Sequence, residues 1–419
     1  MTKEYTSLGL MSGTSGDGVD ASIIRSDGHM HYDSVVDKYF EYDKNIYENI
    51  HSLKKKINSL KDLKKFSKKI TSLEKKITLF HSEVVKDISK GTKIDLVGFH
   101  GQTMYHNPTE KISKQLGDGN LLSKLTKKTV VYNFRENDIK HGGQGAPLTP
   151  IFHNLLAIQI KKKLKDKSWP INIINIGGIS NYTSTNTNTR EHFVSSIFAY
   201  DIGPGNCLID EWIRKKSNKR FDKDGLIARS GKPNKLIIKY CIKNFNNQEF
   251  EKSLKRDKSN LVYKRSFDTK DFDMSEVENL SLKDGAATLT DFTAAIILQG
   301  LRAKEIGHPN LTKWLVCGGG RKNRYLMESI TKKGPDYLKG DNYIVNVNEQ
   351  LDHWKQISLE PIDNYGVDGD FVESQAFAYL AIRSFLKMPI SSCYTTGCKS
   401  KDKDGFTGGL SGGVIVKTK

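Results

Sequence analysis

The chain has 419 residues, with 66 Lys and Arg against 48 Asp and Glu and a formal net charge of +18. Hydrophobic residues make up 37% of it, enough to build a packed interior, so the composition excludes a disordered chain, a collagen and a disulfide-stapled miniprotein. At roughly 100–200 residues per domain, the length predicts two or three domains or lobes. The isoelectric point near 9.4 stands out, because a basic surface is typical of proteins that bind nucleic acid or an anionic membrane.

The cysteines and the hydropathy pattern indicate a compartment. The five cysteines are scattered, and no two have the C-x-x-C spacing of a zinc site or a redox dithiol. The first residues lack the apolar stretch of a secretory signal, and nowhere do about 18 apolar residues follow one another as in a membrane-spanning helix. We therefore expect reduced thiols, a cytoplasmic location and no membrane partner.

The first 43 residues are predicted to form strands. Ser7 to Met11 and Val19 to Arg25 are apolar runs, and residues 12–18 between them are rich in turn formers. After a second turn, His31 to Tyr42 is again strand-like.

Residues 51–90 carry much of the excess charge, with 12 Lys against 4 Asp and Glu. Apolar residues recur there in steps of three and four, the period of one helix face, so we predict one or two amphipathic helices with a Lys-rich outer face. A helix that binds nucleic acid or a membrane surface is one interpretation. Aromatic residues are not interleaved with the lysines as stacking platforms, so we favour a solvated face and expect no nucleic-acid partner.

Strands and helices alternate along the rest of the chain, which predicts α/β architecture. Leu8 to Asp20 and Phe198 to Asp210 both run from an apolar strand through a Gly-rich turn. This internal echo suggests two similar lobes with a cleft between them. Further strands are expected at residues 94–99, 129–134, 171–176, 195–200, 314–317 and 414–416, and helices at 150–163, 208–215, from 323 and at 370–386.

The first of three Gly-rich turns comprises Gly13, Thr14, Ser15, Gly16, Asp17, Gly18, Val19 and Asp20. Glycines let backbone N–H groups approach an anion, and the two hydroxyls add donors. Asp17 or Asp20 suits a Mg²⁺ ion held through water. An ordinary hairpin turn is the alternative, because Asp-Gly favours one. The standard P-loop and dinucleotide-binding motifs are absent from the sequence.

Two more Gly-rich turns follow apolar strands, at Asp201 to Asn206 and at Gly318 to Asn323. An acid at a strand end beside such a turn suits a general base in a cleft, so Asp201 is a catalytic candidate. The alternative is that Asp201 caps the following helix. The third turn is flat enough to pack against a planar base or ribose, or else it is a strand turn without a ligand.

Two further clusters carry polar groups. His100 and Gln102 place an imidazole and an amide at a predicted strand end, although a lone histidine is more often structural. Arg135 is a bidentate binder of carboxylate or phosphate, or one side of a surface salt bridge. Because no H-x-x-H or H-E-x-x-H pattern occurs, we expect no catalytic zinc.

Together and in this order, these motifs resemble the anhydro-N-acetylmuramic acid kinases. That family belongs to the superfamily of actin, the heat-shock chaperone ATPases and the sugar kinases. The resemblance extends over nearly the whole chain, from residue 8 to residue 416. The matching segments are Gly9 to Ser15 with Asp17 to Asp20, His100 to Thr103, Gly142 to Leu148, Asn175 to Asn181, Gly203 to Asn206, Cys317 to Gly320 and Val372 to Ala378.

The resemblance implies two RNase H-like lobes, residues 1–148 with 384–419 and residues 149–383, that close on MgATP and a sugar. It implies a kinase that opens the 1,6-anhydro ring of anhydro-N-acetylmuramic acid and phosphorylates O6, giving N-acetylmuramic acid 6-phosphate and ADP in cell-wall recycling. Asp201 would activate the attacking water. The implied ATP contacts are Gly13 to Asp20, Gly203, Gly205, Asn206, Gly318, Gly319, Gly320 and Asn323, and the implied sugar contacts are His100, Gln102, Arg135 and Glu373.

Three residues, Gly16, Asn133 and Ile202, differ from those usual in the family and keep other functions open. One alternative is a kinase of another 1,6-anhydro sugar such as levoglucosan, for which Arg135 would find no carboxylate. Another is a catalytically weakened nucleotide-binding sensor, which the changes at Asn133 and Ile202 favour. The resemblance is also compatible with a homodimer.

Overall fold

The computed structural model describes residues 3–165, 171–185, 197–254, 266–305, 313–337, 358–399 and 408–418. The chain divides into two compact units. The first consists of Met1–Ile160, Thr185–Ala199 and Asp370–Lys419, and the second of Lys161–Ser184 and Tyr200–Gly369.

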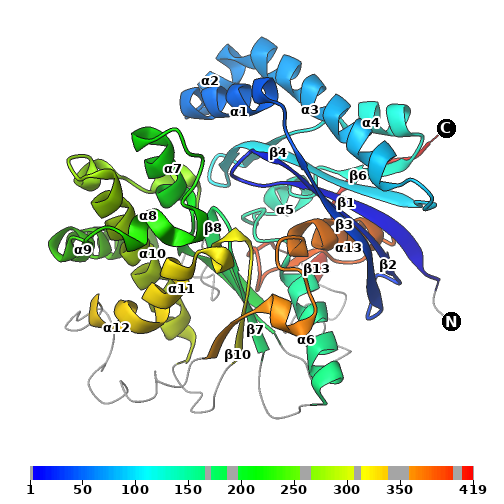
Figure 1. Cartoon of the computed structure of the whole chain (residues 1–419). Coiled ribbons are helices and arrows are strands. Elements are labelled where there is room, and N and C mark those ends of the chain that lie inside the picture. Colours follow the sequence, from blue (N-terminus) through cyan, green and yellow to red (C-terminus); the bar gives the residue numbers. More distant parts are fainter. Residues whose placement is uncertain are drawn as a thin grey trace. The chain divides into compact units, whose positions relative to one another are not determined.

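The first unit is a seven-stranded sheet with helices on both faces. Figure 1 shows helices α1, α3 and α4 on one face and α13 on the other. Its elements are β1 (Tyr5–Ser12), β2 (Gly18–Ser26), β3 (Tyr32–Glu41), α1 (Lys44–Lys56), α2 (Leu60–Lys65), α3 (Ser67–Ile88), β4 (Leu96–Asn107), β5 (Ile112–Leu116), α4 (Gly119–Thr126), β6 (Thr129–Tyr132), α5 (Glu136–Lys140), α6 (Pro150–Leu164), α13 (Val372–Phe385), β12 (Ser391–Ser392), β13 (Gly409–Leu410) and β14 (Val414–Val416).

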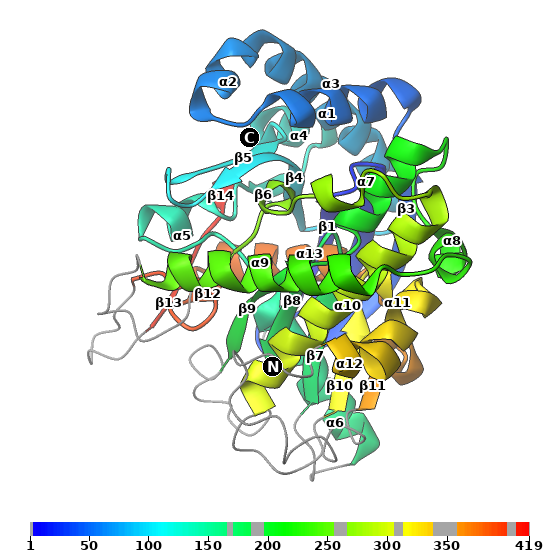
Figure 2. The ribbon, with the colours of Figure 1, turned by 90° about the vertical axis from the view of Figure 1, so that its left-hand side faces the viewer.

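The second unit is a five-stranded sheet with a group of helices, in which α9 and α10 pack against each other (Figure 2). Its strands are β7 (Ile171–Ile176), β8 (Ile179–Ser184), β9 (Phe198–Pro204), β10 (Lys313–Cys317) and β11 (Ser358–Pro361). Its helices and short turns are α7 (Cys207–Lys216), η1 (Lys223–Gly225), α8 (Leu226–Arg229), α9 (Lys235–Leu254), η2 (Thr269–Asp271), η3 (Ser275–Val277), α10 (Leu282–Glu305), η4 (Gly319–Lys322), α11 (Arg324–Glu328), η5 (Ser329–Lys333), α12 (Gly334–Tyr337) and η7 (Ile362–Tyr365).

The two sheets have the same strand order. In the first, the order β3-β2-β1-β4-β6 contains an antiparallel β1–β2–β3 meander followed by β4 and β6 parallel to β1. In the second, the order is β9-β8-β7-β10-β11, with β7 and β8 antiparallel and β10 parallel to both β7 and β11. The predicted α/β class with two RNase H-like units is therefore confirmed.

The two units do resemble each other, but the segments that correspond between them are not the ones expected from the sequence. The counterpart of Leu8 to Asp20 is the β7–β8 hairpin at the start of the second sheet, not Phe198 to Asp210. Phe198 to Asp210 contains β9, the third strand, and the start of α7. The expectation of two similar units was right, but the pairing of segments was wrong, because short apolar runs followed by glycines occur at more than one strand of each sheet.

The boundaries of the units differ from the predicted ones at 148/149 and 383/384. Helix α13 packs on β1, β2 and β4, so residues from Asp370 onward belong with the first sheet. Gly9 of β1 makes this contact close, because a Cβ on Gly9 would lie 1.9 Å from the carbonyl oxygen of Ser374. The first two residues of β9 also belong to the first unit, where the Ala199 N–H donates to the Tyr394 carbonyl oxygen at 3.3 Å.

The Lys-rich region forms three helices, α1, α2 and α3, rather than one or two. The Asp43 side chain caps α1 by accepting from the Ile46 N–H. Ile50 and Ile77 are fully buried in the core of the first unit, whereas most lysines of these helices are exposed. The predicted amphipathic pattern is therefore confirmed, with a break at residues 57–59 and another at residue 66 between the helices.

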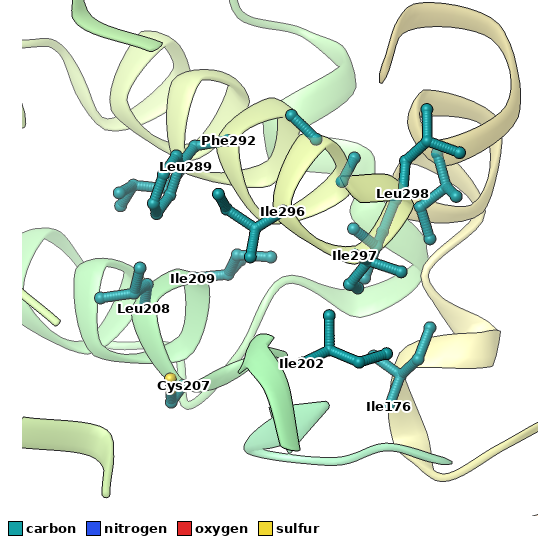
Figure 3. Close-up of a cluster of buried hydrophobic side chains, with 14 of the residues drawn as sticks. Ile176, Ile202, Cys207, Leu208, Ile209, Leu289, Phe292, Ile296, Ile297 and Leu298 are labelled. Atoms are coloured by element: carbon teal, nitrogen blue, oxygen red, sulfur yellow. The ribbon is translucent and has the colours of Figure 1, made fainter. Parts of the chain in front are cut away.

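The core of the second unit lies between its sheet and helices α7 and α10 (Figure 3). Ile202 of β9 and Ile176 of β7 are fully buried there, near Ile296 and Ile297 of α10. Ile202 packs on Gly300, where a Cβ would lie 2.3 Å from its Cγ2 atom. The isoleucine at this position therefore fills the hydrophobic core.

A membrane-spanning helix needs about 20 predominantly apolar residues, and few helices of the described ranges are that long. Within those ranges, every helix is either too short or too polar to cross a bilayer.

A buried histidine makes the stability of the first unit sensitive to acid. His81 on α3 is fully buried, its ring 4.8 Å from that of Phe99, and its Nδ1–H donates to the Ile77 carbonyl oxygen at 2.8 Å. Burial lowers the pKa of His81 from 6.5 to about 4. The unfolded chain therefore binds a proton more readily than the folded chain between these values, and the free energy of unfolding falls as the pH falls below 6.5.

We predict that His81→Leu reduces this acid sensitivity. From the two pKa values, we expect the buried neutral ring to make the free energy of unfolding about 2 kcal/mol smaller at about pH 5 than at about pH 7. Denaturant unfolding at both pH values should show a smaller difference in the variant than in the unmodified protein. An equal difference in both proteins would contradict the assignment to His81.

Candidate active site

The first Gly-rich segment joins the antiparallel strands β1 and β2. Met11 pairs with Asp20 across this hairpin, so the last residues of the motif lie in β2 and the turn runs from Gly13 to Asp17. Gly16 has a φ of +62°, a left-handed conformation that glycine adopts without steric cost. Its N–H donates to the Gly13 carbonyl oxygen at 3.1 Å. The segment is thus a hairpin turn whose tip is open to solvent, and the Asp17-Gly18 pair lies at the start of β2 rather than at the centre of the turn.

The tip of the turn presents hydroxyl and carboxylate groups. Thr14 and Ser15 are exposed and Asp17 is half-buried, with its Oδ1 accepting from the Ser15 hydroxyl at 2.6 Å. Within the described residues, no three His, Cys, Asp or Glu side chains gather as a metal site. A Mg²⁺ ion that keeps most of its waters needs only one or two carboxylates besides a phosphate. Asp17 fits that smaller requirement through its hard oxygen donors.

One lysine of the basic helices contacts this turn. The Lys54 ammonium on α1 donates to the Thr14 carbonyl oxygen at 2.8 Å. We expected the lysines of residues 51–90 to form a solvated face, and Lys54 departs from this expectation through its contact with Thr14. The reason is tertiary: α1 begins two residues after β3, which pairs with β2, and so returns to the β1–β2 turn.

Arg135 lies beside two neutral acceptors. Its Nε and Nη2 lie 3.3 and 2.9 Å from His100 Nε2, and its Nη1 donates to the Gly145 carbonyl oxygen at 2.7 Å. His100 Nδ1–H in turn donates to the Gly101 carbonyl oxygen at 2.7 Å. His100 therefore orients the guanidinium group through its unprotonated nitrogen, and the two residues predicted separately form one unit.

The electrostatics around Arg135 keep the neighbouring imidazoles neutral. Burial, and then the positive charge of Arg135, hold the pKa of His100 well below its ordinary value. The same two causes, in the same order, lower the pKa of the half-buried His106 to about 3. The positive charge at this position therefore belongs to the guanidinium and not to the rings.

The loop that supplies the Gly145 carbonyl is anchored by a buried carboxylate. Asp138 Oδ2 accepts from the Gly145 N–H at 2.7 Å, and its Oδ1 accepts from the Thr396 hydroxyl at 2.5 Å. The Gln144 N–H donates to the Thr396 carbonyl oxygen at 2.8 Å. This arrangement fixes the second partner of Arg135 to the rest of the first unit.

Gln102 and Glu373 lie in different surroundings. Gln102 in β4 is fully buried, and its amide bonds to Ser12 and Gly13, behind the first turn. Glu373 is half-buried in the first turn of α13, where a carboxylate is stabilised by the helix dipole. The same helix turn is fixed to β2, since Ser374 Oγ lies 2.6 Å from Ser22 Oγ.

In the second unit, Asp201 lies within β9 rather than at a strand end. It is only 5% exposed, and its Oδ2 accepts from the Phe267 N–H at 2.9 Å. The alternative that Asp201 caps the next helix is wrong, because the residue at the N-terminus of α7 is Asn206. The sequence could not indicate Phe267, which follows Asp201 by 66 residues.

The turn after Asp201 packs on the turn between β7 and β8. The N–H groups of Gly205 and Asn206 donate to the carbonyl oxygens of Gly178 and Gly177 at 2.9 and 2.8 Å. The Ser180 hydroxyl donates to the Pro204 carbonyl oxygen at 3.1 Å. Gly203, at the end of β9, lies against Ile296 of the core. The residues of this turn that are predicted to contact ATP are thus held by the Gly177–Gly178 turn between β7 and β8.

The third turn follows β10 and lies next to the second. A Cβ on Gly318 would lie 2.7 Å from the Ile176 carbonyl oxygen, and one on Gly319 would lie 3.9 Å from Asn206 Nδ2. Gly320 packs on Ile176 in the same way. Asn323 is buried, and its Oδ1 caps α11 by accepting from the Leu326 N–H at 3.0 Å.

Arg321 stabilises this third turn. Its Nε and Nη2 bond to both carboxylate oxygens of Asp363 at 2.6 and 2.8 Å, and its Nη1 donates to the Gly318 carbonyl oxygen at 3.0 Å. Hydrogen bonding from Arg321 lowers the pKa of Asp363 below its ordinary value. The pattern Gly-Gly-Gly-Arg was visible in the sequence, but nothing there indicated that the arginine is 4% exposed and serves the turn.

Within each unit, the predicted site residues therefore form groups. The first unit joins His100 to Arg135 and Gln102 to the Gly13–Asp17 turn, and the second gathers Asp201 with two Gly-rich turns. The residues that support these groups but were not predicted are Ser12, Tyr42, Lys54, Gly145, Ser180, Phe267 and Arg321.

Comparison with known proteins identifies the family. The model of the family described as anhydro-N-acetylmuramic acid kinase matches residues 5–340. A protein of that name from Pelagibacter ubique is 52% identical over 421 residues, covering 100% of both chains. The chain belongs to the anhydro-N-acetylmuramic acid kinase family.

More distant relatives bear the same name. The protein from Brucella canis is 35% identical and covers 98% of both chains, and that from Rhodospirillum rubrum is 33% identical, covering 93% of this chain and 90% of its own. Among solved structures, a ROK family glucokinase from Streptomyces griseus covers 90% of this chain and 99% of its own, at 12% identity and a TM-score of 0.37. A likeness of that size does not establish a shared ligand.

We predict that Lys54→Met weakens the binding of the phosphoryl donor. Removing an ammonium group beside the Gly13–Asp17 turn should raise KM for the donor about two- to fivefold, the size expected of a partly exposed charge. The effect should shrink as salt is added. Lys55→Met is the matched control, since it removes one charge from an exposed position of the same helix. Equal changes in KM for both variants would contradict a specific contribution of Lys54.

Proposed function

We propose that the chain uses ATP to open the 1,6-anhydro ring of anhydro-N-acetylmuramic acid and to phosphorylate O6, releasing N-acetylmuramic acid 6-phosphate and ADP. The observation that carries this proposal is the Asp201 carboxylate, buried and held by the Phe267 N–H directly before a Gly-rich turn, in a chain of this family. A water-activating base must be held in position opposite its substrate.

In the proposed reaction, Asp201 removes a proton from a water molecule as the water oxygen bonds to the anomeric carbon. The bond from that carbon to the bridging oxygen breaks, and its electron pair stays on the oxygen. That oxygen, now O6, bonds to the γ-phosphorus, and the bond from phosphorus to the leaving oxygen of ADP breaks. The hydrogen bond from Phe267 to Asp201 Oδ2 fixes the orientation of the carboxylate for the first step.

The nucleotide contacts are proposed for the three Gly-rich turns. Gly13 to Asp20 would hold phosphate oxygens with backbone N–H groups and hydroxyls. The turns at Gly203 to Asn206 and Gly318 to Gly320 would face the rest of the nucleotide. Mg²⁺, held through water by Asp17, would neutralise charge on the phosphates. Asn323 would act through its cap on α11, since its side-chain oxygen already accepts from Leu326.

The sugar contacts are proposed for Arg135 and Glu373. An arginine fork recognises a carboxylate, and the lactyl group of a muramic acid carries one. His100 would act by orienting Arg135, because its Nε2 accepts from the guanidinium. Glu373, half-buried on the first turn of α13, would accept from sugar hydroxyls.

One experiment separates this proposal from its alternatives. The protein is incubated with MgATP and either anhydro-N-acetylmuramic acid or levoglucosan, and ADP and the 6-phosphosugar are measured by mass spectrometry. Product from the muramic acid supports the proposal. Product from levoglucosan alone would favour the other anhydro-sugar kinase, and nucleotide binding without either product would favour the sensor. Incorporation of labelled solvent oxygen at the anomeric carbon tests the role of water.

We predict that Asp201→Asn abolishes turnover, because an amide cannot accept the proton of the attacking water. The amide retains an acceptor for the Phe267 N–H, so the fold and the affinity for ATP should stay close to those of the unmodified protein. Turnover is measured by ADP release and affinity by calorimetry. Turnover within about tenfold of the unmodified protein would show that another group is the base.

We predict that Arg135→Met raises KM for anhydro-N-acetylmuramic acid about ten- to hundredfold, since a hydrogen bond between charged groups is lost. KM for ATP should not change. The matched control substrate is the methyl ester of the lactyl group. Because the ester lacks the negative charge, its KM should rise less in the variant. Equal losses for the acid and the ester would mean that Arg135 does not bind the carboxylate.

The cytoplasmic location and the homodimer remain predictions. Size-exclusion chromatography with light scattering measures the second directly.

A further inference from the structure

Three carbonyl groups of the Gly13–Asp17 turn, and that of Gly18, accept hydrogen bonds from other residues of the first unit. Such bonds hold the carbonyl oxygens, which repel anions, in fixed directions. The bonds are Gln102 Nε2 to Gly13 O at 3.0 Å, Lys54 Nζ to Thr14 O at 2.8 Å, the Tyr42 N–H to Asp17 O at 2.9 Å and the Ser12 hydroxyl to Gly18 O at 3.0 Å.

Three buried side chains form the inner part of this arrangement. Ser12, Gln102 and Tyr42 are 1%, 0% and 3% exposed. The Tyr42 hydroxyl donates to Ser12 Oγ at 3.0 Å, and Ser12 Oγ donates to Gln102 Oε1 at 2.7 Å, sharing its one proton with the bond to Gly18. The Gln102 Nε2 group then donates to Gly13. This Tyr42–Ser12–Gln102 chain links β1, β4 and the residue after β3 to the turn.

The hydrogen bonds of the Tyr42–Ser12–Gln102 chain all run in one direction, from Tyr42 toward Gly13. Burial raises the pKa of the Tyr42 phenol above its ordinary value, so the hydroxyl keeps its proton and acts as the donor. Ser12 Oγ accepts a hydrogen bond from Tyr42 and donates one to Gln102 Oε1. The Gln102 amide then donates through Nε2 to the Gly13 carbonyl oxygen. Because an amide has both an acceptor and a donor, Gln102 is suited to the last position.

The opposite side of the turn has donors available. Thr14 and Ser15 are exposed, and their backbone N–H groups donate to no described part of the chain. Successive N–H groups directed outward from a turn make an anion-binding concavity only when the adjoining carbonyls are directed elsewhere. The Tyr42–Ser12–Gln102 chain meets this requirement, because it holds the carbonyl groups of Gly13 and Gly18, which lie on either side of the open N–H groups.

We infer that Ser12, Gln102 and Tyr42 are positioning residues that hold the first turn in its phosphate-binding conformation, and that Gln102 acts on the nucleotide side of the reaction through Gly13. The inference rests on the proposed function in one respect, namely that this turn holds the phosphates of ATP. It assigns Gln102 a role different from the sugar contact that the family resemblance implied.

The variants are chosen to remove hydrogen bonds with little change of volume. Tyr42→Phe removes the first donor, Ser12→Ala the middle group and Gln102→Met the bond to Gly13. Each should raise the dissociation constant for a non-hydrolysable MgATP analogue about tenfold, the loss of one buried network bond. The dissociation constant for anhydro-N-acetylmuramic acid, measured without nucleotide, should change less than about twofold.

A matched control separates positioning from general destabilisation. Tyr379 on α13 is fully buried and donates through its hydroxyl to the His29 carbonyl oxygen at 2.7 Å, away from the turn. Tyr379→Phe should lower the melting temperature as Tyr42→Phe does, yet leave nucleotide affinity unchanged. The double variant Ser12→Ala with Gln102→Met should lose less affinity than the sum of the single losses, because the two residues share one bond.

Unchanged nucleotide affinity in folded Ser12→Ala and Gln102→Met would overturn the inference, and so would an equal loss of affinity for the sugar. Nucleotide binding is measured without turnover, so this result does not depend on whether the proposed reaction is correct. If the unmodified protein binds the ATP analogue but phosphorylates no anhydro sugar, the proposed function fails while the positioning role is still tested.

Discussion

The shape of each Gly-rich turn depends on the directions in which its carbonyl groups are held. A peptide turn offers an N–H and a C=O at each residue, and an anion is attracted by the first and repelled by the second. In the first unit, side chains and backbone donors hold the carbonyls of Gly13, Thr14 and Asp17. In the second unit, the carbonyls of Gly177 and Gly178 accept from the next turn. Each turn is therefore held by groups distant in the sequence.

Neutral hydrogen-bond partners also contact the charged groups of both units. The guanidinium of Arg135 bonds to a neutral imidazole and to a backbone carbonyl, and its charge, after burial, helps to keep the pKa of His100 low. The Asp201 carboxylate accepts a hydrogen bond from the backbone N–H of Phe267. The net charge of +18, by contrast, comes mostly from exposed lysines, and the lysine of the basic helices that contacts the Gly13–Asp17 turn is Lys54.

The two sheets repeat one strand order, and this repetition explains which predictions succeeded. The β1–β2 and β7–β8 hairpins begin the two sheets, and the β9 strand carries Asp201 at the edge next to β8. Apolar runs followed by glycines indicated these strands from the sequence, and apolar residues in steps of three and four indicated the Lys-rich helices. The pairing of Leu8 to Asp20 with Phe198 to Asp210 was wrong because the local pattern of a strand and a turn does not reveal the position of the strand within its sheet.

The sequence by itself determined the α/β class, most strands and helices, the Gly-rich turns and the family, because periodicity, turn formers and ordered motifs are local properties of the chain. The tertiary structure decided which groups serve those motifs. Gln102 lies 89 residues from Gly13, and Phe267 lies 66 residues from Asp201. Lys54 looked like any other lysine of an amphipathic helix. Hydrogen bonds between such distant residues form only when parallel strands and packed helices bring them together, and no local pattern in the sequence reports that distance.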